Sequence, residues 1–86
     1  MYEIEIPEPV ERELTKRFDK HMLKRLHKRI KKLEIAPDVH GKPLRGPLAG
    51  IWEVYFERRW RVLYTIDYER KVVTLRAVKH KDEMAK

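Results

Sequence analysis

The spacing of apolar residues changes along the chain, and each change predicts a different element. Residues 2–6 alternate with a period of two, which predicts a short strand with Ile4 and Ile6 facing inward. After a proline-rich connection, apolar residues recur at four-residue steps, which predicts an amphipathic helix with Pro9 in its first turn. The residues that carry this helical pattern are Val10, Leu14 and Phe18.

A second helix is predicted directly after Asp19, whose side chain is of the type that caps helix N-termini. We expect this helix to end near Ala36, because Pro37 disfavours helical conformation in the residue before it. So short a link between two helices predicts an antiparallel helical hairpin. The apolar stripe of the second helix consists of Met22, Leu23, Leu26, Ile30 and Leu33.

The second half of the chain has the pattern of strands and turns. Residues 38–43 have no period and are predicted to be a loop. Two apolar-aromatic runs, 51–56 and 60–66, flank Glu57-Arg58-Arg59, which is typical of a β-hairpin. A turn at 67–70 precedes a further run rich in β-branched residues, 72–78, which predicts the last strand.

Alternation along these strands predicts which side chains share a face. A turn centred on Arg58 places Tyr55 opposite Arg61 and Glu53 opposite Leu63. On the last strand we expect the core-facing residues to be Val73, Leu75 and Ala77. The residues expected to join Arg61 on the opposite face are Arg76 and Val78.

The predicted order of elements is therefore strand, helix, helix, strand, strand, strand. Three consecutive strands joined by tight turns form an antiparallel sheet, and the helical hairpin covers one face of it, which defines an α+β fold. The partner of the first strand is left open. With 86 residues, no internal repeat and no low-complexity linker, the chain is predicted to be a single domain, 1–86.

The charge composition narrows the kinds of partner. Charged residues make up 41% of the chain, and Lys and Arg outnumber Asp and Glu by 21 to 14. The net charge of +7 therefore favours a surface that binds a polyanion, either a nucleic acid or an acidic protein.

Other classes of site are disfavoured. Cysteine is absent, which excludes disulfides and thiolate metal sites, and the four histidines lack metal-ligand spacing. We therefore expect no metal. No apolar run is long enough to span a membrane and the N-terminus has no signal-peptide pattern, so we expect a soluble cytoplasmic protein without a membrane partner.

Four segments together resemble the RelE-type toxins of the RelE/ParE superfamily, and the similarity covers nearly the whole chain. They are Leu44-Arg45-Gly46, Gly50-Ile51-Trp52-Glu53-Val54, Trp60-Arg61-Val62-Leu63-Tyr64-Thr65-Ile66 and Val78-Lys79-His80-Lys81. The resemblance implies a RelE-like fold, here with the final helix absent or truncated.

It also implies the toxin of a type II toxin–antitoxin system. Such a toxin is a ribosome-dependent endoribonuclease that cleaves mRNA in the A site through attack by the RNA 2′-hydroxyl, without a metal or small-molecule cofactor. Its implied partners are the ribosome, mRNA and a neutralising RelB-like antitoxin.

The resemblance also assigns roles to individual residues. Arg61 matches the catalytic arginine of the family's strand, and Lys81 falls where the family places a second catalytic arginine. The expected RNA-binding residues are Arg45, Arg58, Arg59, Arg76, Lys79 and His80. Two features depart from the family pattern. Glu53 and Tyr55 occupy positions where some members carry lysines, and residues 82–86 contain no counterpart of the late tyrosine.

Several alternatives stay open at the level of sequence. A ParE-type gyrase poison needs no nuclease residues, and a catalytically weak or inactive relative would only bind an antitoxin. Arg61 could be a solvated strand residue in a plain cross-strand ion pair with Glu53. The basic second helix is either a solvated face or a contact for ribosomal RNA phosphates. The group that moves protons is not assigned among Glu53, His80 and Lys81.

Overall fold

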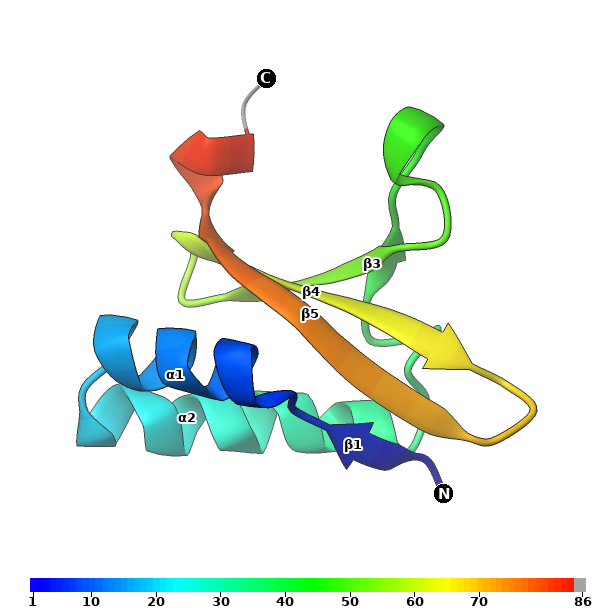
Figure 1. Ribbon diagram of the computed structural model, residues 1–86, viewed down its shortest axis with the longest axis horizontal. Helices are drawn as coiled ribbons and strands as arrows, with labels where there is room; N and C mark the ends of the chain where they lie inside the picture. The colour runs from blue at the N-terminus through cyan, green and yellow to red at the C-terminus, as the bar shows by residue number, and fades with distance from the viewer. Residues whose placement is uncertain (85–86) are drawn as a thin grey trace.

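The computed structural model describes residues 1–84 and consists of a five-stranded sheet with both helices on one face (Figure 1). The strand order is β1-β5-β4-β3-β2. The strands are β1 (Glu3–Glu5), β2 (Lys42–Pro43), β3 (Trp52–Phe56), β4 (Trp60–Asp67) and β5 (Val72–His80). The helices are α1 (Glu8–Arg17) and α2 (Lys20–Lys31), with one-turn 3₁₀ helices η1 (Lys32–Glu34), η2 (Gly46–Leu48) and η3 (Lys81–Met84). The predicted α+β class is confirmed.

The helical hairpin forms as the sequence predicts. Pro9 lies in the first turn of α1, and the Asp19 carboxylate caps α2 by accepting a hydrogen bond from the backbone N–H of Met22 at 2.9 Å. After Lys31 the chain continues as η1, which ends at Glu34 with Ile35 as its C-cap, close to the expected end. None of the helices among residues 1–84 has the length and apolar character needed to cross a membrane.

The first strand completes the sheet in a way that local patterns do not reveal. β1 pairs in parallel with β5, with Glu3 beside Val72, so the sheet is mixed rather than wholly antiparallel. The two helices carry the chain from one edge of the sheet to the other, which leaves β1 beside the last strand. Within the predicted loop, Lys42 and Pro43 form the short edge strand β2 against Glu53 and Trp52.

The hairpin register is confirmed, because Tyr55 pairs with Arg61 and Glu53 pairs with Leu63. Between β4 and β5, however, the register shifts, so that Leu63 pairs with Ala77 but Tyr64 pairs with Leu75. Arg76 is thus an extra residue on β5.

This β-bulge corrects one of the predicted faces. A bulge reverses the alternation of side chains beyond it. Val78 is 2% exposed and belongs to the core, whereas Ala77 lies on the face opposite the helices. The prediction that Ala77 faces the core and Val78 joins Arg61 is therefore wrong. Lys79 is the residue that pairs with Arg61.

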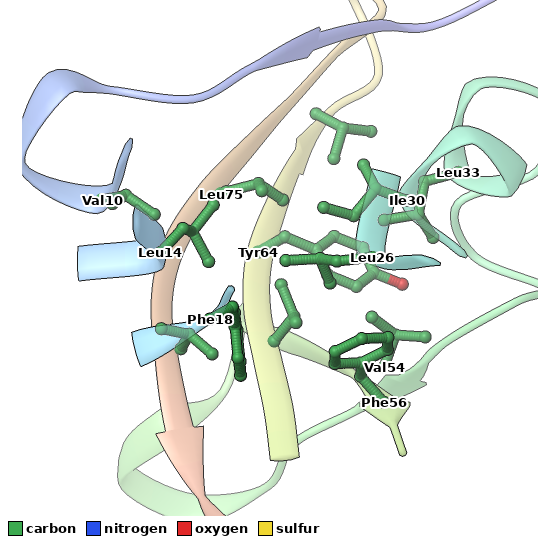
Figure 2. Packing of buried hydrophobic residues seen from close by; sticks show 13 residues of the cluster. Val10, Leu14, Phe18, Leu26, Ile30, Leu33, Val54, Phe56, Tyr64 and Leu75 are labelled. Atoms are coloured by element: carbon green, nitrogen blue, oxygen red, sulfur yellow. The ribbon is translucent and has the colours of Figure 1, made fainter. Parts of the chain in front are cut away.

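The core fills the space between the helices and the sheet (Figure 2). Phe18 contacts two aromatic rings edge-on, with centroids 5.6 Å from Phe56 and 4.9 Å from Trp60. The remaining members come from both helices, from η1 and from β3, β4 and β5. Those exposed by 1% or less are Leu14, Leu26, Leu33, Val62, Tyr64, Val73 and Leu75.

Tyr64 carries the one hydroxyl group within this core cluster (Figure 2). Its Oη donates a hydrogen bond of 2.6 Å to the carbonyl of Pro37, and burial raises the pKa of the phenol. Gly41 allows this arrangement, because a Cβ at that position would lie 1.8 Å from the Tyr64 oxygen. The hydrogen bond from Tyr64 holds the segment between η1 and β2 against β4, and Gly41 leaves room for the phenol.

We expect Gly41→Ala to lower the free energy of unfolding, and to lower it less when Tyr64→Phe has already removed the oxygen atom nearest to the new methyl group. Tyr64→Phe alone should cost about 1–3 kcal/mol, because the buried Pro37 carbonyl loses its donor. Urea unfolding of the two single variants and the double variant measures this coupling. Strictly additive effects would contradict it, and the half-exposed Tyr68→Phe is the control.

Candidate functional site

Arg61 lies on the face of the sheet that the helices leave open. Its guanidinium stacks on the ring of Tyr55, with Cζ 3.8 Å from the ring centroid. Its Nε lies 3.9 Å from Oε1 of Glu53, and the two side chains are only 16% and 14% exposed. The Arg61 side chain is thus mostly buried against two neighbours from β3 and is not a freely solvated strand residue.

The hairpin turn fixes the same guanidinium from another side. Nη1 of Arg61 donates hydrogen bonds to the carbonyls of Arg58 at 2.9 Å and Trp60 at 3.0 Å. Glu57 and Arg58 both have positive φ, at 52° and 65°, which is uncommon for residues other than glycine. This tight turn brings the Arg58 carbonyl to the guanidinium. Among residues 1–84 the structure assigns Nη2 of Arg61 no hydrogen bond.

Two lysines extend the positive charge around Arg61. Lys79 is its cross-strand partner on β5, and Lys42 on β2 places Nζ 5.2 Å from the Tyr55 ring centroid. Tyr55, 44% exposed, therefore contacts a cation from each neighbouring strand. We call these five residues, including Glu53, the Arg61 cluster. It holds three cations and one carboxylate, and so it suits a phosphate group.

The turn after β5 places Lys81 beside the hairpin. The N–H of Lys81 donates to the carbonyl of Arg59 at 2.7 Å. Glu83 fixes this turn, because its Oε1 accepts the N–H of His80 at 2.6 Å and lies 3.5 Å from Nη2 of Arg17 on α1. The His80 hydrogen bond first, and then the charge of Arg17, lower the pKa of the Glu83 carboxyl.

The other expected RNA-binding residues are spread more widely. The ring of His80 contacts Trp60 edge-on at 5.2 Å, on the helix-covered side of the sheet. Arg76 donates from Nε to the Thr65 hydroxyl at 3.0 Å, and exposed Arg45 precedes η2. The structure thus gathers one group around the hairpin turn and leaves Arg45, Arg76 and His80 apart. That group comprises Arg58, Arg59, Arg61, Lys79 and Lys81.

From the sequence, Lys42 was only a loop residue that could contact RNA phosphates, as Arg45 could. Its place beside Tyr55 and Arg61 was not predicted, because a two-residue edge strand has no detectable period. For a metal the geometry offers nothing within residues 1–84, where no three His, Asp or Glu side chains lie close enough together to bind one ion.

This fold, with a basic open sheet face, is that of RelE-type toxins of the RelE/ParE superfamily. Residues 4–85 match the family model described as the ParE toxin of the type II toxin–antitoxin system parDE. The chain belongs to this toxin family of type II toxin–antitoxin systems.

Solved structures agree with this assignment. The toxin–antitoxin complex RelBE2 from Mycobacterium tuberculosis matches with a TM-score of 0.82 and 30% identity, over 92% of this chain and 96% of that chain. The isolated Escherichia coli RelE toxin gives a TM-score of 0.75 at 20% identity, over 93% and 84%. The archaeal RelE–RelB complex from Pyrococcus horikoshii gives 0.72 at 20%, over 93% and 94%. The last two support the fold alone. No curated protein matches the sequence.

We expect the contact between η3 and α1 to weaken in acid. Because folding lowers the pKa of Glu83, its contribution is fully present above the ordinary glutamate pKa and is lost as the pH falls through the lowered value. Amide hydrogen exchange at His80 and Lys81, followed from about pH 7 to pH 3, should show this opening. Glu83→Gln should abolish the pH dependence of the protection of these two amides against exchange. Asp82→Asn should keep it. An unchanged profile in Glu83→Gln would assign the transition to another group.

Proposed function

We propose that this toxin is an endoribonuclease that cleaves mRNA on the ribosome, with Arg61 binding the scissile phosphate. The observation that carries the proposal is the position of Arg61, held rigid on an open sheet face between Tyr55 and Lys79. A cation fixed before the substrate arrives needs no reorganisation when charge develops on the phosphorus.

In the proposed reaction the ribose 2′-oxygen attacks the adjacent phosphorus and the bond to the 5′-oxygen breaks. The products are a cyclic phosphate end and a 5′-hydroxyl end. Arg61 and Lys81 stabilise the extra negative charge of the phosphorane. One proton leaves the 2′-hydroxyl and one reaches the leaving oxygen. His80 packs against Trp60 on the other face, which favours Glu53 or Lys81 for these transfers. The ribosome aligns the attacking and leaving oxygens.

We infer a cognate antitoxin as the protein partner. The complexes from M. tuberculosis and P. horikoshii each pair a RelE-type protein with a RelB-type protein. The net charge of +7 would attract an acidic antitoxin segment to this chain. The ribosome and mRNA are the other partners that this function requires.

A gyrase poison of the ParE type is the second candidate, favoured by the description of the matching family. A catalytically weak, antitoxin-binding relative is the third, because Glu53 neutralises part of the charge of Arg61 and residues 82–86 lack a tyrosine. Primer extension on mRNA after induction, together with a gyrase cleavage assay on supercoiled plasmid, distinguishes the three. Ribosome-phased cuts support the nuclease, cleaved supercoiled DNA supports the poison, and neither supports the inactive relative.

We expect Arg61→Ala to lower mRNA cleavage by roughly 10²–10³-fold, the usual effect of losing one donor to a developing anion. Arg61→Lys should retain an intermediate rate, because it keeps a charge and loses the planar fork of donors. Arg70→Ala, in the turn at the other end of β4, is the matched control. Circular dichroism verifies folding, because Arg61 also bonds the hairpin turn. A fully toxic, fully cleaving Arg61→Ala variant would remove Arg61 from the site.

Lys81 gives a second prediction. Lys81→Arg should maintain or raise the cleavage rate, because guanidinium restores the bidentate donor typical of phosphate sites. Lys81→Ala should lower it, while the backbone bond to Arg59 persists. Single-turnover cleavage on programmed ribosomes measures both. If neither change alters the rate, Lys81 is a surface residue without a catalytic role.

A further inference from the structure

The turn η3, which contains Lys81, depends for its position on contacts with other elements. It is a single turn of 3₁₀ helix and has no buried residue. So short a segment is not a stable helix by itself, because starting a helix costs more free energy than one turn of hydrogen bonds returns. In Figure 1, η3 is drawn in red and follows β5 on the side of the sheet away from the helices. Its contacts therefore determine where Lys81 lies.

Two polar contacts among residues 1–84 join η3 to elements other than β5. The backbone N–H of Lys81 donates a hydrogen bond of 2.7 Å to the carbonyl of Arg59 in the hairpin turn. On α1, Nη2 of Arg17 lies 3.5 Å from Oε1 of Glu83. With the first contact alone η3 could pivot about one hydrogen bond. Two contacts to different elements restrict its orientation.

The carboxylate of Glu83 links α1 to the backbone beside Lys81. The Oε1 atom that faces Arg17 also accepts the N–H of His80 at 2.6 Å. A hydrogen bond to a charged acceptor is stronger than one between neutral groups. The position of the Arg17 guanidinium is therefore transmitted, through one carboxylate, to the residue that directly precedes Lys81.

The guanidinium of Arg17 is held in place by its own surroundings. Its Nε donates to Oε2 of Glu13, one helical turn earlier, and its Cζ lies 5.2 Å from the centroid of the Trp60 ring. The Arg17 side chain is 27% exposed, whereas that of Arg12, which also forms an ion pair on α1, is 67% exposed. Because Arg17 is already ordered, its contact with η3 costs less side-chain entropy than a solvated arginine would lose.

We propose that Arg17 is a positioning residue for mRNA cleavage: acting through Glu83, it sets the position of η3 and therefore of Lys81. This inference rests on the proposed function, in which Lys81 stabilises the phosphorane. Arg17 does not act on the phosphate itself, because it packs against Trp60 on the helix-covered side of the sheet. A lysine held beside the reacting group stabilises the developing charge more often than one on a mobile turn.

The test is a double-mutant cycle between Arg17 and Lys81. Single-turnover cleavage on programmed ribosomes, at several ribosome concentrations, is measured for Arg17→Ala, for Lys81→Ala and for the double variant. Arg12→Ala is the matched control, because it removes an ion pair of the same helix, that with Glu8, in which η3 takes no part. Amide hydrogen exchange at Lys81 reports the attachment of η3 independently of cleavage.

We expect Arg17→Ala to lower the maximal cleavage rate about tenfold without changing the apparent affinity for ribosomes, since a misplaced catalytic group can cost up to about 10²-fold. In the Lys81→Ala background the same change should have less than about a twofold effect, because no lysine is left to position. Arg17→Lys should recover part of the rate, because it keeps the charge that faces Glu83. Exchange at Lys81 should be faster in Arg17→Ala and unchanged in Arg12→Ala.

An equal loss of rate from Arg17→Ala with and without Lys81 would overturn the inference, because it would indicate lost stability or a separate contact with RNA. A wild-type rate in Arg17→Ala, or in Lys81→Ala, would also overturn it. Urea unfolding verifies that each variant is folded. If Arg17→Ala does not fold, Glu83→Gln takes its place in the cycle, because glutamine keeps an oxygen for the His80 N–H and loses the charge.

The exchange measurement does not depend on cleavage, so the two proposals can fail separately. If the wild-type toxin leaves mRNA intact and Arg17→Ala still accelerates exchange at Lys81 selectively, the proposed function fails and the attachment of η3 by Arg17 stands. If the wild type cleaves mRNA and Arg17→Ala cleaves it like Arg12→Ala, the positioning role fails and the nuclease stands.

Discussion

The bonds from Nη1 of Arg61 to the carbonyls of Arg58 and Trp60 determine how the open face is arranged. They require a turn in which two non-glycine residues, Glu57 and Arg58, adopt left-handed backbone angles, at a cost of order 1–2 kcal/mol each. The same turn presents Glu57 to Arg25, so it also holds α2 against the sheet. One strained turn thus fixes the guanidinium of Arg61 and contacts α2. Because the guanidinium is already ordered, binding an anion would cost less conformational entropy.

The local patterns of the chain predicted most of the fold. Helix capping by Asp19 and alternation through the β3–β4 hairpin depend on near neighbours. The cap was predicted at the correct residue, and the hairpin was predicted with the correct register. The errors lie where distant strands meet. The bulge at Arg76 is a property of the β4–β5 pair, and the parallel partner of β1 is about 70 positions away in the sequence. No periodicity within one segment contains that information.

The candidate site shows the same difference between features that depend on near neighbours and features that depend on distant contacts. Arg61 could be found from its strand motif, and its pairing with Tyr55 followed from the position of the turn. Lys79 was expected to bind RNA, but its place opposite Arg61 depends on the bulge. The attachment of α2 to the hairpin could not be predicted, because Arg25 meets Glu57, 32 positions further along the chain.

Glu53 is the residue whose role the geometry changes most. Some family members carry a lysine at this position, so Glu53 lowers the positive charge available to bind an anion. Its carboxylate, however, lies 3.9 Å from Nε of Arg61, and its side chain is 14% exposed. Together with the Tyr55 ring it keeps the guanidinium against the sheet while the site is empty. In the proposed reaction an incoming phosphate would compete with this carboxylate for the same cation, since one guanidinium cannot fully neutralise both anions. This competition would weaken phosphate binding in the ground state. The same carboxylate is also, with Lys81, one of the two candidates to accept the proton of the attacking hydroxyl, so in the proposed reaction a group that lowers affinity would take part in the chemistry.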